Sequence, residues 1–284
     1  MSARRLLAAL ACSAIALLTP VRSEASGPPI GASGALSDTI FSSDNQRAAI
    51  VEQRETSTEV RLVDPQSRHL IHAWSVKGQW GLPLVTYAEL GGIDAHGRTL
   101  VLAEPNDTGT DTRFLVFDLE SPATPRMITL HGVFGYDALS PTGDRLYLIQ
   151  GTARANGARF SRFDRYVVRS YDLRHDVLQT RVVSDPRERA GAMEGYAMAR
   201  ATSTDGAWVY TLYVGGAHAF VHALHTTAGR ARCLDLPWTG KTTRMPVTAS
   251  LYKGRLTLTD DRGTVLARID TKRLSVRSLV DPTT

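Results

Sequence analysis

The stretch "ALSPTGDRLYLIQ" at residues 138–150 decides the fold of this chain, because its layout recurs along the sequence. A polar turn ending in Gly lies between two short apolar stretches. The same layout is found in "SSDNQRAAIVE" (42–52), "GIDAHGRTLVLAE" (92–104), "ATSTDGAWVYTLY" (201–213) and "LYKGRLTLTDD" (251–261). Each copy has Gly or Asn where a tight hairpin needs a positive φ, and each then alternates apolar and polar residues like a strand. The chain therefore contains five hairpins of one kind.

A second repeated element follows each of these hairpins. It consists of a strand, an Asp, a few turn residues and another strand, as in "LVFDLESPATPRMITL" (115–130). The marker positions are Asp64, Asp118, Asp172, His225 and Asp270, with spacings of 54, 54, 53 and 45 residues. An Asp at such a place accepts backbone N–H groups of the turn that follows it. We expect the marker carboxylates to be structural rather than catalytic.

Together the two elements give a unit of four strands, which in the third copy lie near 135–140, 145–150, 166–172 and 177–183. No amphipathic helix interrupts the units. A four-stranded antiparallel unit repeated every ~40–50 residues is typical of a propeller blade. The sequence predicts an all-β fold, a β-propeller of five four-stranded blades that close into a ring, with six blades possible. A two-sheet β-sandwich is the alternative.

"SPTGDRLYLI" (140–149) and "LVFDLES" (115–121) resemble the blades of the YVTN-type, lactonase-like β-propeller repeat superfamily. The resemblance covers residues 36–280 and extends to uncharacterised secreted propeller proteins of actinobacteria. It implies the fold and not the function, because such blades carry enzymes, binding modules and surface proteins alike.

The N-terminus has the layout of a secretory signal peptide. Arg4 and Arg5 precede an apolar run from Leu6 to Leu18, and "SEA" at 23–25 provides small residues for cleavage. We expect a signal peptide at 1–25, a linker at 26–35 and one propeller domain at 36–284. The mature chain would be secreted or held in the cell envelope, after export by the Sec or the twin-arginine route.

Charge and cysteine content narrow the classes of partner. Without residues 1–25 the chain keeps 30 Lys and Arg against 27 Asp and Glu, a balance that does not favour a nucleic-acid partner. No later stretch is apolar enough to span a bilayer, so we expect no transmembrane segment in the mature chain. Only Cys233 remains after cleavage, so no intramolecular disulfide can form and the core must supply the stability.

Two features that interrupt the repeat are candidates for ligand binding. The third unit carries an insertion, "GTARANGARFSRFDRY" (151–166), in which Arg159, Arg162 and Arg165 alternate with aromatic residues. The crossings between blades place an aromatic residue after a Gly, at Trp80, Phe134, Tyr136 and Tyr196. The insertion could instead be a solvated loop, and the aromatic residues could wedge between neighbouring blades.

Candidate catalytic residues precede the repeated turns on the innermost strands, at Asp38, Glu89, Asp137 and Arg200. If they point into a central funnel, their carboxylates could cleave a glycoside or bind Ca²⁺. Otherwise they are solvated or Arg-paired acids, and we expect Asp137→Ala to leave folding intact. No other cofactor is expected, and His218, His222 and His225 cannot all face one metal, because strand side chains alternate.

The sequence therefore predicts a secreted β-propeller that binds a protein, a glycan or a small molecule at its face. The alternative is a hydrolase or lactonase sited in the funnel. No catalytic motif such as G-x-S-x-G occurs, and enzymatic activity is not assigned.

Overall fold

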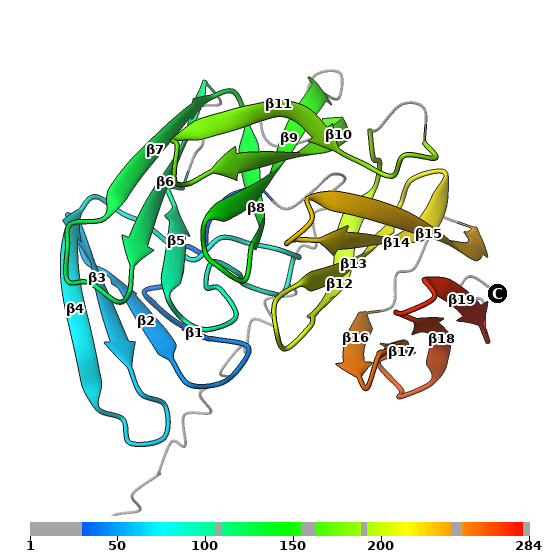
Figure 1. Ribbon diagram of the computed structural model, residues 1–284, viewed down its shortest axis with the longest axis horizontal. Coiled ribbons are helices and arrows are strands. Elements are labelled where there is room, and N and C mark those ends of the chain that lie inside the picture. Colours follow the sequence, from blue (N-terminus) through cyan, green and yellow to red (C-terminus); the bar gives the residue numbers. More distant parts are fainter. Residues whose placement is uncertain (1–29, 106–109, 155–162, 189–191, 240–245, 281–284) are drawn as a thin grey trace, which may run out of the picture.

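The computed structural model describes residues 30–105, 110–154, 163–188, 192–239 and 246–280. Its strands form five antiparallel sheets that follow one another along the chain around a common axis, as blades of a β-propeller (Figure 1). No helix long and apolar enough to cross a membrane is found in these ranges. Five sheets confirm the predicted number of blades.

Each blade is a meander of consecutive strands, with the first strand innermost. Blade 1 contains β1 (Ser37–Phe41), β2 (Ala48–Gln53), β3 (Ser57–Val63) and β4 (Leu70–Lys77). Blade 2 contains β5 (Thr99–Ala103), β6 (Asp111–Asp118) and β7 (Arg126–His131). Blade 3 contains β8 (Phe134–Leu139), β9 (Arg145–Arg154), β10 (Phe163–Asp172) and β11 (Val177–Val183). Blade 4 contains β12 (Tyr196–Thr202), β13 (Trp208–Val214), β14 (His218–His225) and β15 (Arg230–Thr239). Blade 5 contains β16 (Val247–Tyr252), β17 (Arg255–Asp260), β18 (Val265–Asp270) and β19 (Ser275–Ser278).

Blade 2 departs from the predicted four strands. The segment before β5 pairs with that strand through two isolated bridges, Gly81–Ala103 and Ile93–Leu100, and through hydrogen bonds such as that from the Val101 amide to the Gly92 carbonyl. Pro83 has no N–H to donate, and Gly92 adopts a φ of +119°. Residues 84–90 leave the sheet between the two bridges, so no regular innermost strand forms.

The repeated turns have the backbone conformation that the sequence predicts. Their Gly or Asn has a φ between 56° and 75° in all five blades, at Asn45, Gly97, Gly143, Gly206 and Gly254. In blades 1, 3 and 4 a Ser donates to the turn Asp and accepts the backbone amide five residues later, as Ser140 does with Asp144 and Arg145. In blade 2 Asp94 stands in the place of that Ser and accepts the amides of His96 and Arg98.

The marker aspartates are structural, as predicted. Asp64 accepts the amides of Gln66 and Ser67 at 2.8 and 2.9 Å, and Asp172 and Asp270 accept two amides in the same way. Asp118 accepts the amide of Glu120. A bond from His175 and the turn amides lower the pKa of Asp172 to about 2. All four carboxylates accept the amide two residues later in the chain. This shared bonding confirms that the repeat marks successive blades.

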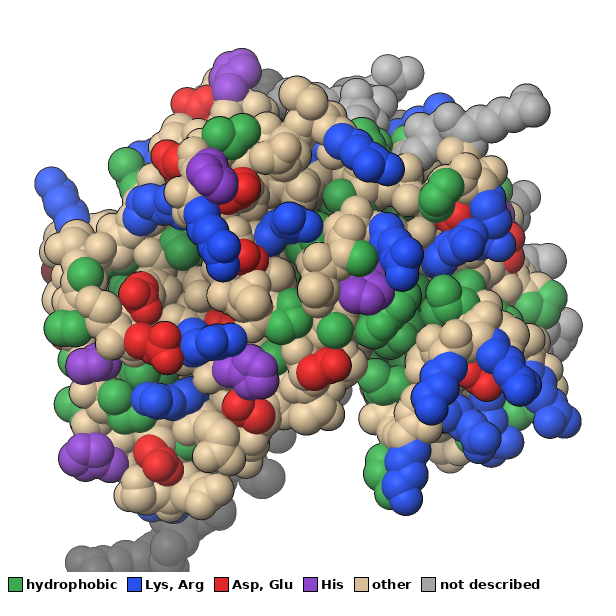
Figure 2. Space-filling view, viewed as in Figure 1, with side chains coloured by type: hydrophobic (Ala, Val, Ile, Leu, Met, Phe, Trp, Pro, Cys, Tyr) green, Lys and Arg blue, Asp and Glu red, His purple; other side chains and the backbone are tan. Residues whose placement is uncertain are grey.

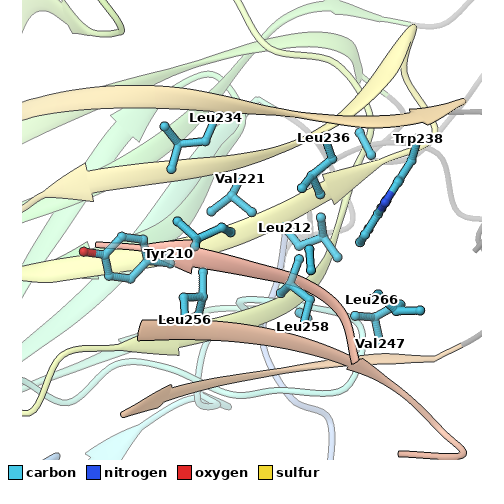
Figure 3. Close-up of a cluster of buried hydrophobic side chains, with 14 of the residues drawn as sticks. Tyr210, Leu212, Val221, Leu234, Leu236, Trp238, Val247, Leu256, Leu258 and Leu266 are labelled. Atoms are coloured by element: carbon cyan, nitrogen blue, oxygen red, sulfur yellow. The ribbon is translucent and has the colours of Figure 1, made fainter. Parts of the chain in front are cut away.

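Four apolar clusters hold the blades together, one between each pair of consecutive blades. Between blades 4 and 5, for example, Tyr210, Leu212 and Val221 face Leu256 and Leu258 (Figure 3). The inner strands of the middle blades are buried on both faces, as β8 and β13 are, whereas outermost strands such as β11 are largely exposed. A lone sheet of four short strands exposes both faces to water, so the neighbouring blades stabilise one another.

The ring is not closed among the described residues, which corrects the prediction of a closed wheel. No apolar cluster of the described residues joins blade 5 to blade 1, and a notch separates the two blades (Figures 1 and 2). Burial alternates along the strands of these end blades, as in β17 and β19, because only one face of each sheet has a neighbour. The outer face of blade 5 is mainly polar, and that of blade 1 carries Glu52, Glu59 and Arg61 beside apolar residues, so the two faces do not match as an apolar junction.

Because the junctions between blades carry the core, Leu258→Ala is expected to lower the free energy of unfolding by about 2–5 kcal/mol. Leu258 is fully buried between blades 4 and 5. Urea unfolding monitored by tryptophan fluorescence measures the change. The exposed Met127 is the control, and Met127→Ala is expected to change stability by less than about 0.5 kcal/mol. Equal effects of the two substitutions would contradict the assignment of the core.

Candidate functional site

A short hairpin between β4 and β5 reaches from blade 2 across the axis to blade 4. Its ends are held by a bridge between Leu84 and Leu90 and by a hydrogen bond from the Val85 amide to the Glu89 carbonyl at 3.0 Å. At its tip, the Tyr87 ring lies edge-on to the Tyr196 ring with centroids 5.8 Å apart. We call residues 84–90 the axial hairpin.

Gly91 is required for the course of the axial hairpin. A Cβ at this position would lie 2.5 Å from Cγ1 of Val85 and 2.7 Å from Cε1 of Tyr136, closer than side chains can approach. The hairpin therefore packs its base directly on a buried ring of blade 3 while its tip touches blade 4. The axial hairpin thus packs against blades 3 and 4 instead of extending the innermost strand of blade 2.

Glu89, Asp137 and Arg200 meet where the axial hairpin reaches blade 4. The Arg200 guanidinium donates from Nη1 to Oδ1 of Asp137 at 3.0 Å and to Oγ1 of Thr211 at 3.2 Å, and from Nη2 to the Asp137 carbonyl oxygen. The Glu89 carboxylate lies close enough to Arg200 for the charge and the backbone amide of Arg200 to lower its pKa. The sequence thus identified three residues that the fold brings together from blades 2, 3 and 4.

The electrostatics of this group are those of a buried ion pair. The side chains of Arg200 and Asp137 are 9% and 2% exposed. The second carboxylate oxygen of Asp137, Oδ2, is buried and has no partner within the described residues. Burial raises the pKa of Glu89, and the nearby charge of Arg200 and its amide offset only part of that effect. The site therefore holds one carboxylate that is paired with Arg200 and one carboxylate, that of Glu89, whose raised pKa makes it easier to protonate than a free Glu.

A polar row extends from this group through blade 4. Arg200, Thr211, His222 and Cys233 are successive cross-strand neighbours on the face toward blade 3. Burial lowers the pKa of His222, so its imidazole is neutral at pH 7, and burial raises the pKa of the Cys233 thiol. The thiol is therefore protonated and inert, as expected for a buried Cys.

Asp185 ends the polar row and was not found by sequence reasoning. Its buried carboxylate accepts the Cys233 amide at 3.0 Å and bonds with Arg187 and Arg232. Burial opposes its ionisation, but the bonds from Arg187 and the two amides outweigh burial and lower the pKa of Asp185 far below its usual range. The nearby "DPRER" (185–189) is the only signal in the sequence, and it does not reveal a partner 48 residues away.

Asp38 stays apart from the other candidate acids. It lies on β1 opposite Val51, half-buried, on the face of blade 1 that packs toward blade 2. Within the described ranges it forms no hydrogen bond or ion pair with Glu89, Asp137 or Arg200. The predicted set of four therefore reduces to three residues in contact.

Three of the four aromatic residues at the crossings are wedges between blades. Trp80, Phe134 and Tyr136 are at most 5% exposed and belong to the clusters between blades 1 and 2 or blades 2 and 3. Gly78 and Gly132, with φ of 92° and 112°, redirect the chain so that the aromatic residue two positions later turns inward. These three side chains therefore pack between neighbouring blades, as in the alternative to ligand binding. Tyr196 differs from them, because it is half-buried and lies beside the exposed Tyr87.

The structure describes only the two ends of the Arg-rich insertion, which belong to β9 and β10. Arg159 and Arg162 lie outside the described residues. Arg165, on β10, is exposed and forms an ion pair from Nε to Oε1 of Glu194 at 3.0 Å. This pair lies at the same end of blades 3 and 4 as Tyr196. No group of three or more His, Cys, Asp or Glu that could hold a metal ion occurs in the described part of the chain.

Comparison with known protein families and with curated proteins found no match. Solved structures with a similar chain course include TolB from Acinetobacter baumannii, at 13% identity and a TM-score of 0.45 over 84% of this chain and 53% of that one. Acylaminoacyl peptidase from Pyrococcus horikoshii matches at 13% identity and a TM-score of 0.49, over 87% of this chain and 39% of the peptidase. A nidogen/laminin complex matches at 13% identity and a TM-score of 0.46, over 86% of this chain and 78% of that one. This chain spans about half the length of TolB and less than half of the peptidase, and these similarities assign no activity.

Because Asp137 is buried in an ion pair, Asp137→Ala is expected to destabilise the fold by about 3–5 kcal/mol, which replaces the expectation that folding stays intact. The loss arises because the buried Arg200 charge loses the carboxylate that neutralises it and keeps hydrogen bonds only to Thr211 and to the backbone carbonyl of residue 137. Urea unfolding of Asp137→Ala and of Asp137→Ala/Arg200→Met measures it, and the double variant should lose less than the sum of the single variants. Glu194→Ala, which breaks an exposed pair, should cost less than about 1 kcal/mol. Equal losses at both pairs would exclude a buried charge pair.

The raised pKa of Glu89 predicts a pH dependence of stability. A carboxyl whose folded pKa exceeds its unfolded value stabilises the fold below the unfolded pKa, and this contribution is lost as pH rises through the folded pKa. Glu89→Gln should therefore be more stable than wild type at pH 7, and the difference should shrink toward pH 4. Unfolding at pH 4, 5.5 and 7 checks this, with the exposed Glu120→Gln as control. A Glu89→Gln protein that is less stable at pH 7 would show that the Arg200 amide outweighs burial.

Proposed function

We propose that this chain is a secreted β-propeller binding module of the cell envelope or extracellular space. Its recognition surface is the face where the crossings meet, which we define by Tyr87, Tyr196, Arg165 and Glu194 and call the crossing face. The observation that carries the proposal is the exposure of Tyr87, 48% accessible at the tip of a braced hairpin. Tyr and Arg are enriched at interfaces because they combine a large apolar area with hydrogen bonding.

Binding is favoured over catalysis by the state of the candidate acids. A general acid or nucleophile must reach the substrate, whereas Asp137 is buried and bonded to Arg200 through both its side chain and its carbonyl. Asp38, which would complete an acidic trio, takes no part in the group. A funnel-sited hydrolase or lactonase remains the second candidate, supported by the raised pKa of Glu89 beside an unpartnered oxygen of Asp137.

We infer the export of this chain and its superfamily from its sequence. The charged and apolar pattern of residues 1–25 supports export and removal of that segment, so that the partner would be met outside the cytoplasm. The YVTN-like repeat supports membership of a superfamily of secreted propellers. The partner would be a protein, a glycan or a small molecule, bound without a nucleic acid and without a resident metal.

A thermal-shift screen tests the proposal with short peptides, neutral and acidic oligosaccharides and lactones, each with and without Ca²⁺. A ligand at 100 times its Kd stabilises the native state by about 2.7 kcal/mol and raises the Tm. We expect a binder whose shift is lost in Tyr87→Ala and kept in Met127→Ala, which changes an exposed side chain on blade 2.

Two outcomes would contradict the proposed function. A ligand whose Tm shift is the same in Tyr87→Ala and wild type binds elsewhere than the crossing face. A ligand that is consumed during incubation, with products seen by mass spectrometry and turnover abolished by Glu89→Gln, would establish the hydrolase instead.

A further inference from the structure

Blade 5 presents one full sheet face that no other part of the described chain covers. The face opposite the cluster with blade 4 is formed by Thr248, Ser250, Tyr252, Arg255, Thr257, Thr259, Val265, Arg268, Asp270, Ser275 and Arg277. We call it the open face. In a closed propeller such a face packs against blade 1, but here it borders the notch between the two blades (Figure 2).

The composition of the open face differs from that of the four buried junctions. Apart from Val265, its neutral residues bear hydroxyl groups, and Tyr252 is 71% exposed. Ser250, Thr257, Arg268 and Arg277 are successive cross-strand neighbours that form a continuous polar row across all four strands. A face of this kind is suited to a hydrated, hydrogen-bonding partner rather than to another apolar sheet.

Blade 5 is also the most basic part of the fold. Residues 247–280 contain seven Lys and Arg against three Asp, and none of the seven has an ion-pair partner in the described part of the chain. The carboxylate of Asp270 on the open face is bonded by the amides of Lys272 and Arg273. Figure 2 shows the Lys and Arg side chains gathered over this blade. The positive charge is therefore not neutralised within the blade.

We propose that the open face of blade 5 binds an acidic polysaccharide. Neighbouring strands lie about 4.8 Å apart, so Arg268 and Arg277 present two guanidinium groups at the spacing of adjacent strands. Guanidinium groups bind carboxylates and sulfates through paired N–H donors. The Ser and Thr hydroxyls of the face can bond sugar hydroxyls. The Lys253 ammonium lies over one side of the Tyr252 ring, 5.1 Å from its centroid, and the other side of this exposed ring can stack on a sugar ring at the end of the face.

Two other occupants fit the open face less well. An anionic membrane is bound most firmly when apolar side chains enter it, and the open face offers only Tyr252 and the half-buried Val265 among its described residues. A second copy of the chain would bring the outer face of its blade 1, but Glu52 there is already paired with Arg54 and Arg61. Charge complementarity therefore favours a partner with many free anionic groups. This site lies on a different face from the crossing face and does not depend on the proposed function.

Calorimetric titration of the full chain with hexagalacturonate tests the proposal, with maltohexaose as the neutral probe. We expect hexagalacturonate to bind and maltohexaose not to bind, with affinity falling at least tenfold between 50 and 500 mM salt because exposed charges are screened, with a Debye length of ~3 Å at 1 M. Arg268→Gln/Arg277→Gln should weaken binding at least tenfold. The matched control, Arg181→Gln/Arg230→Gln, removes the same charge from exposed sites on blades 3 and 4 and should bind like wild type.

Three results would overturn the proposal. The first is equal binding by the two double variants, which would reduce the effect to net charge. The second is tighter binding to phosphatidylglycerol vesicles than to hexagalacturonate, lost in Arg268→Gln/Arg277→Gln, which would assign the face to a membrane. The third is a dimer in sedimentation that the same variant dissociates, which would assign the face to a second copy. Circular dichroism and Tm of both variants establish that they are folded.

Discussion

Every blade of this protein depends on the packing of its apolar face against the next blade. A sheet of four strands, each 4 to 10 residues long, cannot shield either face from water alone. The chain solves this with four apolar junctions between five sheets. The inner strands of the middle blades are consequently buried on both faces, and the two end blades each have an outer face that carries polar residues. The polar residues of these outer faces serve the same purpose as the capping repeats of solenoid proteins.

The repeat itself could be predicted from the sequence because its determinants are local. A positive φ at Gly143 or Gly254 and the amide bonds of Asp64 or Asp270 each involve residues a few positions apart. Hydrophobic alternation then sets which face of each strand is buried. The open ring was not predicted, because closure depends on whether two faces separated by about two hundred residues attract one another, and no local pattern records that.

The candidate site could be predicted only in part, for the same reason. Position on the innermost strands correctly brought together Asp137 and Arg200, yet it did not show that they would be buried as a pair. It also placed Asp38 with them, although blade 1 orients that residue toward blade 2. Glu89 reaches the group for a different reason, since it lies on a hairpin and not on a strand. Tyr87 and Asp185 were missed because their contacts are made across blades.

The bracing of blade 2 against blade 4 has a consequence for how the molecule comes apart. Blade 2 touches blade 4 at both ends of the axis, through Tyr87 and Tyr196 at one end and through Ala95, packed against Gly206, at the other. Blades 2, 3 and 4 are therefore in mutual contact. Among the described residues the apolar contacts of blade 5 are with blade 4 alone, so we expect blade 5 to open locally more readily than the middle blades.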